Sequence, residues 1–456
     1  MLSLILLVLV AVARVGAADE RPNILFFLVD DMGIGDTSVP FLYRDGAAQK
    51  IPLNSLYRTP NMEKLAANGR LFTNAYSYSV CSPTRISLMT GQEAPRHRVT
   101  TWTHPKSSSI DTGLVKTAEI RSPDGWRVTG IDRSLPLLPR LMKQAGYRTL
   151  FAGKAHFGPD DTPSGDPKQL GFDVNIAGFG GGGPGSYWGT YNYSANHRTG
   201  AHVWDVPGLE KYHGTDTFLT EAITLEMNQA IEKSVRAKKP FFAYMSHYAV
   251  HAPWQYPDQR FVDHYPQLDG HGLAFATLIE GMDKSLGDMI QKLEELGVAE
   301  KTLVIFFSDN GSAWSADGPY REKKGSRFEG GLRVPLIVSW AKPDAQHPLQ
   351  QDLAIPENSV EHHIVTCVDM MPTLLSLAGA NLPAGAIIDG HDLCPYFRGS
   401  PGTHRPQEFL THFPHRHHNS LFSTYRKEDW KIIYNYASET WELYHLREDP
   451  LERMNL

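Results

Sequence analysis

Four short, almost continuous apolar runs constrain the fold of this chain more than any other feature. They are Asn23–Val29, Arg148–Ala152, Pro240–Met245 and Thr302–Phe307. Runs of this length without polar alternation are typical of strands buried on both faces, as in parallel sheets. Between them lie segments with helical spacing: Asn61–Ala67, Leu135–Ala145, Thr217–Ala237 and Ala274–Leu296. This alternation predicts an α/β fold, in which a mostly parallel central sheet is flanked by helices.

The pattern changes near the C-terminus. From residue 390 onward, short strands are expected to follow one another: Leu421–Arg426, Trp430–Tyr436 and Trp441–His445. Consecutive short strands of this kind predict antiparallel pairing. We therefore expect a main domain over residues 21–389 and a small antiparallel C-terminal subdomain over residues 390–456.

Composition narrows the range of functions. Of the 456 residues, 41% are hydrophobic and 21% are charged, as in a soluble globular protein. The formal net charge of −6 argues against a nucleic-acid partner, because non-specific binding to nucleic acid usually needs a basic surface. If the substrate is anionic, positive charge has to be concentrated in its site.

The N-terminus has the features of an export signal. Met1–Val12 is almost wholly apolar, and Gly16-Ala17-Ala18 supplies small residues before Asp19. We predict that residues 1–18 are a signal peptide, so that the protein is exported to the periplasm or secreted. The apolar run is short for a membrane span, so we expect no stable membrane anchor. The segment departs from the usual pattern in having no lysine or arginine before the run.

Two of the apolar runs lead directly into acidic residues. Asp30-Asp31 follows the first run, and Asp309-Asn310 follows the fourth. Ligands of open α/β sheets bind beyond the carboxyl ends of the strands, so these side chains are expected at one edge. Oxygen ligands without histidine or thiolate suit a hard cation such as Ca²⁺. Each pair alone favours a turn, but together at two strand ends they favour a metal site.

The other two runs lead to basic side chains. Lys154 and His156 follow the second run, and His251 follows the third. Lys324 lies later, in a stretch of basic residues and glycine that reads as a solvated loop entering a strand. Taken singly, each of the four has an ordinary structural interpretation. The position of the first three after buried strands places them at the same edge as the acids.

The segment Cys81–Arg85 lies where a helix is expected to begin, since Pro83 suits the first helical turn. Helix N-termini present free N–H groups that attract anions. A cysteine placed there, with an arginine four residues on, suits chemistry on an oxyanion. The other two cysteines, Cys367 and Cys394, either pair with each other or stay as buried thiols.

The pattern Cys81-x-Pro83-x-Arg85 resembles the signature of the type I sulfatases, in which this cysteine is oxidised to Cα-formylglycine. The resemblance covers nearly the whole mature chain and includes Gly91-Gln92, Gly153-Lys154 and Phe328–Pro335. It implies the fold of the alkaline phosphatase superfamily, with residues 21–389 as the catalytic domain. Thr84 stands where the signature most often has serine, and it keeps the hydroxyl group.

The resemblance also implies a role for individual residues. It implies that Ca²⁺ is bound by Asp30, Asp31, Asp309, Asn310 and the modified Cys81. It implies that the sulfate is surrounded by Arg85, Lys154, His156, His251 and Lys324. Hydrated formylglycine, a gem-diol, is then the nucleophile at sulfur. His251, with or without Lys324, protonates the departing oxygen, and His156 accepts the proton of the second hydroxyl.

The function that the resemblance implies is that of an exported sulfatase, similar in look to bacterial carbohydrate sulfatases. A formylglycine-generating enzyme or an equivalent maturase is then a partner during export, and the substrate is a sulfated carbohydrate. Two alternatives remain open. One is a phosphodiesterase or phosphonate hydrolase of the same superfamily, and the other is a catalytically silent relative that binds sulfated glycans with Cys81 unmodified.

Candidate substrate-binding residues are less specific. The glycines of Gly180–Gly183 would let a polysaccharide approach the backbone or would form a flexible lid. Aromatic side chains that either stack on sugars or simply pack are Trp188, Tyr191, Trp204 and Trp254. A histidine cluster, which lines the substrate cleft, binds adventitious metal or, as we expect, lies in a solvated loop, comprises His412, His415, His417 and His418.

Overall fold

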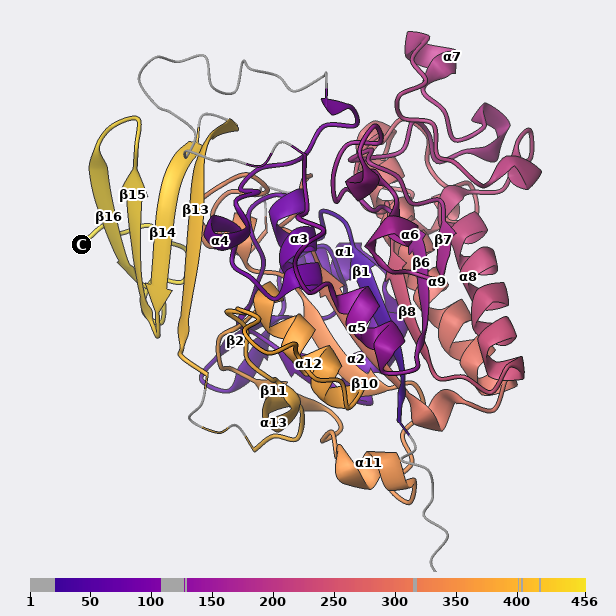
Figure 1. The fold of residues 1–456 in the computed structure, drawn as a ribbon. Coiled ribbons are helices and arrows are strands. Elements are labelled where there is room, and N and C mark those ends of the chain that lie inside the picture. The colour runs from indigo at the N-terminus through magenta and orange to yellow at the C-terminus, as the bar shows by residue number, and fades with distance from the viewer. Residues whose placement is uncertain are drawn as a thin grey trace, which may run out of the picture.

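An eight-stranded sheet runs through the centre of the computed structural model, which describes residues 21–107, 127, 129–314, 318–400, 402, 405–417 and 420–456 (Figure 1). The predicted signal peptide, residues 1–18, lies outside this part of the chain. From edge to edge the strands are Ser359–Glu361 (β11), Arg70–Phe72 (β4), Leu336–Trp340 (β10), Thr302–Ser308 (β9), Asn23–Val29 (β1), Phe241–Ser246 (β8), Arg148–Gly153 (β6) and Val174–Ile176 (β7).

The sheet is mostly parallel, as predicted. β1 pairs in parallel with β8 and β9, and β6 pairs in parallel with β7 and β8. β10 is antiparallel to both of its neighbours, β9 and β4. The four apolar runs are confirmed as β1, β6, β8 and β9, the strands at the centre of the sheet. Their apolar character follows from burial on both faces.

Helices cover both faces of the sheet. Alternate side chains of β1 enter two separate cores: Leu25, Phe27 and Val29 enter one, and Ile24, Phe26 and Leu28 the other. The first core is closed by Pro60–Ala67 (α2), Leu219–Arg236 (α8) and Gly270–Glu295 (α9). The second is closed by Cys81–Thr90 (α3), Leu138–Gln144 (α5) and Met370–Leu377 (α12). The four predicted helices are α2, α5, α8 and α9, and helix α3 begins at Cys81, as its sequence indicated.

The remaining elements are short. The strands are Leu42–Arg44 (β2), Ala47–Gln49 (β3), Ala75–Tyr76 (β5) and Val365–Thr366 (β12). The helices are Pro52–Leu56 (α1), Ala94–His97 (α4), Pro167–Leu170 (α6), Asn196–Thr199 (α7), Glu329–Leu332 (α10), Pro348–Asp352 (α11) and Cys394–Phe397 (α13).

A separate antiparallel sheet of four strands forms the C-terminal part, drawn in yellow in Figure 1. Its strands, each paired with the next, are Glu408–His417 (β13), Ser420–Lys427 (β14), Trp430–Asn435 (β15) and Thr440–His445 (β16). Its core includes Val80 and Phe328 of the main domain. The predicted subdomain is therefore present as a sheet, while the exact boundary at residues 389 and 390 stays a prediction.

Three expectations are settled by local structure. The histidine cluster is not a solvated loop: His412 and His415 lie on β13, where His415 is fully buried and bonds to Thr100. His418 lies outside the described residues. Cys367 and Cys394 are both free and buried, so the two-thiol alternative holds. Within the described part of the chain, no helix has the length and apolar character needed to span a membrane.

Candidate active site

The register of the central strands brings the polar residues that follow them to one edge of the sheet. Val29 of β1 lies opposite Ser308 of β9, so Asp30 and Asp309 emerge side by side. Gly153 of β6 lies opposite Ser246 of β8, which places Lys154 at the same edge. The strand-end prediction is confirmed in its geometry, because parallel neighbours end together.

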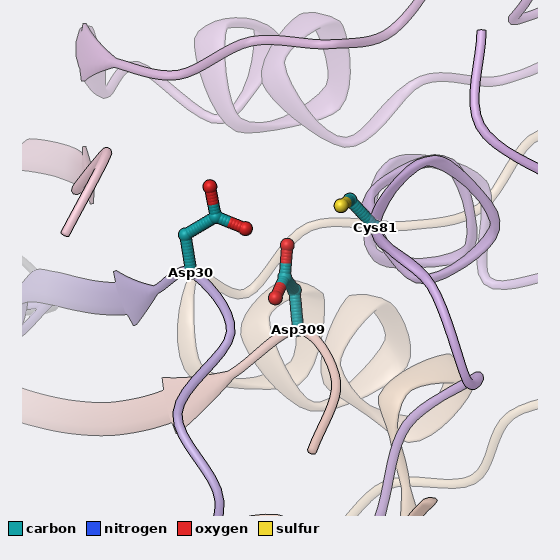
Figure 2. Close-up of side chains that lie close together, drawn as sticks. All are labelled: Asp30, Cys81 and Asp309. Carbon is teal, nitrogen blue, oxygen red and sulfur yellow. The ribbon is translucent and has the colours of Figure 1, made fainter. Parts of the chain in front are cut away.

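Helix α3 aims its first residue at this edge. Figure 2 shows the side chains of Asp30, Asp309 and Cys81 pointing toward one another, the first two from strand ends and the third from the start of the helix. One ligand atom from each of the three lies within 4.8 Å of the others, and all three residues are buried. A single metal ion can contact all three at this spacing.

Two buried cations hold these acids in place. Arg85 Nε donates to Asp309 Oδ2 at 2.8 Å, and Arg85 Nη1 donates to Ser246 Oγ at 2.7 Å. Lys154 Nζ donates to Asp30 Oδ2 at 2.6 Å. All four charged side chains are 0% exposed. Charges so deeply buried have to be paired, and here each acid has at least one cationic partner.

Asp31 forms the other half of the site. Its carboxylate accepts bonds from Lys324 Nζ at 2.8 Å and from Asn310 Nδ2 at 2.8 Å, and His251 Nε2 lies 3.7 Å away. Burial alone would raise the pKa of Asp31, but the positive charge of Lys324 outweighs it and lowers that pKa. Lys324 therefore belongs to the site and not to the solvated loop that its neighbours suggested.

Two oxygens of the site lack donors. Asp30 Oδ1 and Asn310 Oδ1 are buried without a hydrogen-bond partner, and the closest Arg85 nitrogen is 3.6 Å from Asp30 Oδ1. Burial, reinforced by the negative charge of Asp309, raises the pKa of Asp30 well above its usual value. Unsatisfied buried oxygens among crowded carboxylates are the environment that a hard divalent cation requires, so the residues fit Ca²⁺.

The two histidines are oriented by backbone carbonyls. His156 Nε2 donates to Thr103 O at 2.8 Å, which leaves Nδ1 as a buried acceptor without a partner. His251 Nδ1 donates to Ala252 O at 2.7 Å, which leaves Nε2 facing Asp31. Burial lowers the pKa of both histidines, that of His251 to about 3. Each ring therefore has one nitrogen fixed and one available for proton transfer.

The glycine-rich loop packs directly on both rings. A Cβ atom on Gly182 would lie 2.8 Å from His156 Cε1, and one on Gly183 would lie 2.8 Å from His251 Nδ1. Real Cβ atoms do not approach other atoms so closely. The expected close approach is therefore made by the chain's own histidines, and these glycines leave space for the rings.

A cavity of about 580 Å³ opens above Cys81. His156, His251 and Lys324 line it, together with Arg198. Of the four aromatic candidates, Trp204 lines the cavity. The others pack elsewhere in the following pairs: Trp188 with Phe218, Tyr191 with His197, and Trp254 with Phe275.

Sequence reasoning missed two serines that end the central strands. Ser246 Oγ accepts the bond from Arg85 and donates to Lys154 O at 2.7 Å. Ser308 Oγ accepts from Met32 N at 3.1 Å. Both hydroxyls organise the backbone around the acids. A small polar residue at the last position of a buried apolar strand is the signal that would have found them.

With this geometry in view, comparison with known proteins identifies the family. A family model described as "Sulfatase" matches residues 22–380. The chain belongs to the sulfatase family. A model described as "N-sulphoglucosamine sulphohydrolase, C-terminal" matches residues 323–456. The protein is thus a sulfuric ester hydrolase with the alkaline phosphatase fold, in agreement with the resemblance in its sequence.

Similar proteins support the same assignment. N-acetylgalactosamine-6-sulfatase of Canis lupus familiaris is 31% identical over 421 residues, covering 88% of this sulfatase and 71% of that protein. A sulfatase of Formosa agariphila is 27% identical, covering 96% of this chain and 85% of that one. The structure titled "Crystal structure of Ps i-CgsB in complex with k-i-k-neocarrahexaose" superimposes with a TM-score of 0.73 at 25% identity, covering 96% of this chain and 89% of that one.

Proposed function

We propose that this sulfatase is an exported enzyme that removes sulfate from sulfated carbohydrates, with formylglycine at position 81 and a bound Ca²⁺ ion. The observation that carries the proposal is the meeting of Cys81 with Asp30 and Asp309, whose ligand atoms lie within 4.8 Å of one another. The carbohydrate part rests on the relatives, whose names include a hexosamine sulfatase and a sulfatase bound to neocarrahexaose.

The donor set supports the cofactors. Asp30, Asp31, Asp309 and Asn310 supply the oxygens, and two of these oxygens lack other partners. Formylglycine supplies a nucleophilic oxygen where a thiol would stall, and Ca²⁺ supplies positive charge against the sulfate oxygens. Helix α3 also presents its N-terminus at residue 81, which favours an anion there.

The remaining residues bind the sulfate and move protons. Lys154 and Lys324 place ammonium groups at the floor of the site, where they stabilise charge that develops on the sulfate oxygens. Arg85 fixes Asp309 and so positions the oxygens around Cys81. His251 Nε2, beside Lys324, donates a proton to the departing sugar oxygen, and His156 Nδ1 accepts one when sulfate is released.

The decisive experiment combines mass spectrometry with kinetics. Protein coexpressed with a formylglycine-generating enzyme should yield a Cys81 peptide lighter than the unmodified one by the difference between a thiol and an aldehyde. It should hydrolyse aryl sulfate in preference to the phosphate ester of the same aryl alcohol. Cys81→Ala should lower kcat at least about 10³-fold while the melting temperature stays close to that of the wild type.

Each alternative predicts a different result. Faster hydrolysis of the phosphate ester would favour the phosphodiesterase or phosphonate hydrolase, and an unmodified Cys81 peptide with glycan binding would favour the silent relative. Full activity of Cys81→Ala would contradict the proposal. Export is tested separately, by determining the N-terminal residue of secreted or periplasmic protein, which should follow residue 17 or 18.

A further inference from the structure

The cavity above Cys81 has a one-sided charge. Among the described residues that line it there is no aspartate or glutamate. The acids of the site, such as Asp30 and Asp309, are 0% exposed and lie below the floor. Two lining side chains, Lys324 and Arg198, carry permanent positive charge. In a chain whose net charge is −6, this concentration of positive charge selects for an anionic ligand.

The two cations differ in what they already bind. Lys324 is committed to Asp31, with Nζ 2.6 Å from Oδ1. Arg198, on α7, pairs with no carboxylate in the described part of the chain. Its Nη2 donates to Gly185 O at 2.5 Å, which ties the side chain to the glycine-rich loop. A guanidinium has five donors, so several remain for a ligand while one holds the group in place.

The walls between the two cations suit a sugar. Trp102 and Trp204 line the cavity, as do Pro184 and Pro253. Indole and proline surfaces pack against the apolar faces of sugar rings. A volume of about 580 Å³ lies in the range of cavities that enclose small ligands, so it can hold a sugar unit with its substituents.

We infer that Arg198 binds a second acidic group of the substrate, separate from the sulfate ester that is cleaved. The preferred substrate is then a sulfated carbohydrate with at least two acidic groups, of which the second is a sulfate or a carboxylate. The planar fork of arginine suits either group through paired hydrogen bonds. This inference rests on the proposed function, and it assigns Arg198 to specificity and not to the chemical step.

The test compares substrates that differ only in the second acidic group. Wild-type enzyme is assayed with one sugar as its monosulfate and its disulfate, and with a sulfated disaccharide with and without a uronic acid. We expect kcat/KM to be about tenfold higher for the substrate with two acidic groups, which corresponds to one charge-assisted contact. Arg198→Ala should abolish this preference through KM, and Arg198→Lys should keep part of it. The disulfate and uronic acid pairs distinguish sulfate from carboxylate.

A matched control is Arg236→Ala, which removes an exposed arginine of α8 that pairs with Glu232 and does not line the cavity. It should leave the preference unchanged. A preference that persists in Arg198→Ala, or its absence in the wild type, would overturn the inference. Calorimetry in a Cys81→Ala background measures binding of the disulfate without turnover. If Arg198→Ala weakens that binding about tenfold but no sulfate ester is hydrolysed by the wild type, the proposed function fails and the inference stands.

Discussion

Two buried clusters of charged side chains differ in how they are neutralised. The active-site cluster consists of Asp30, Asp31, Asp309, Arg85, Lys154 and Lys324. The C-terminal cluster, which joins the main domain to the four-stranded sheet, consists of Glu329, Glu452, Arg333, Arg426 and Lys431. Both are almost completely shielded from water, so in both an unpaired charge would be costly.

The C-terminal cluster satisfies its own carboxylates. Lys431 Nζ lies 3.0 Å from Glu329 Oε1 and 2.7 Å from Glu452 Oε1. The other Glu329 oxygen accepts from Arg333 at 2.8 Å, and the other Glu452 oxygen accepts from the Glu329 backbone N–H at 2.7 Å. Every carboxylate oxygen of this cluster therefore has a partner within the protein.

The active-site cluster leaves Asp30 Oδ1 without a donor and surrounds it with other acids. The protein's own cations hold the outer oxygens, and the inner ones face Cys81. The comparison teaches that a buried charge cluster built for structure is closed, whereas one built for function keeps ligand atoms open.

The largest expected effect comes from changing an acid in the open cluster. Asp30→Asn keeps the shape and an oxygen for Lys154 but removes a negative charge from the calcium site. We expect hydrolysis of aryl sulfate to fall about 10³-fold, since metal stabilisation of the transition state amounts to several kcal/mol. Calcium at 100 times its Kd should stabilise the wild type by about 2.7 kcal/mol, and this gain should vanish in the variant. Thermal unfolding with and without calcium measures it. An unchanged calcium gain in the variant would remove Asp30 from the site.

The next effect concerns the closed cluster. Lys431→Met removes the cation that Glu329 and Glu452 share, leaving two buried carboxylates short of a partner. We expect the free energy of unfolding to fall by about 3–5 kcal/mol, by the same amount with and without calcium. Denaturant unfolding measures this loss. Lys427→Met, at an exposed position in the same sheet, is the control and should change little. A loss confined to calcium-loaded protein would mean that the two clusters are not independent.

The smallest effect tests the glycines that cover the open cluster. Gly182→Ala and Gly183→Ala have no positive backbone φ to oppose them, so each is expected to act by displacing the neighbouring histidine ring. We expect kcat to fall about tenfold in each, because small misplacements of a catalytic group are costly. Gly272→Ala, whose Cβ would meet its nearest atom at 3.9 Å, is the matched control. Steady-state kinetics that showed wild-type kcat in both loop variants would contradict a positioning role.

The sequence predicted the central strands and long helices well, and the edges of the sheet poorly. β1, β6, β8 and β9 are apolar because they are buried on both faces, and this leaves a direct mark on the sequence. The edge strands β4, β7 and β11 have three residues each, too few for a period to show. The antiparallel direction of β10 depends on partners distant in the chain, which no local pattern records.

For the site, the same division holds. Asp30 and Asp309 were predictable because each directly follows a buried strand. Lys324 was not predictable from its neighbours, which suggest a solvated loop, and the resemblance to sulfatases alone placed it at the sulfate. The structure shows its ammonium on Asp31, 293 residues away in the chain. Gly182 and Gly183 were recognised as unusual, but their contacts with the histidines were not.

By itself, the sequence determined the α/β class, the residues at the ends of the buried strands and the cysteine at the start of a helix. These features follow from local apolar runs and helix signals, which act over a few residues. Tertiary structure alone decided which oxygens lack partners, where Arg198 lies relative to Cys81, and how Lys431 closes the second cluster. The physical reason is that partner choice in a buried cluster depends on strand pairing and packing between distant segments, which local sequence does not encode.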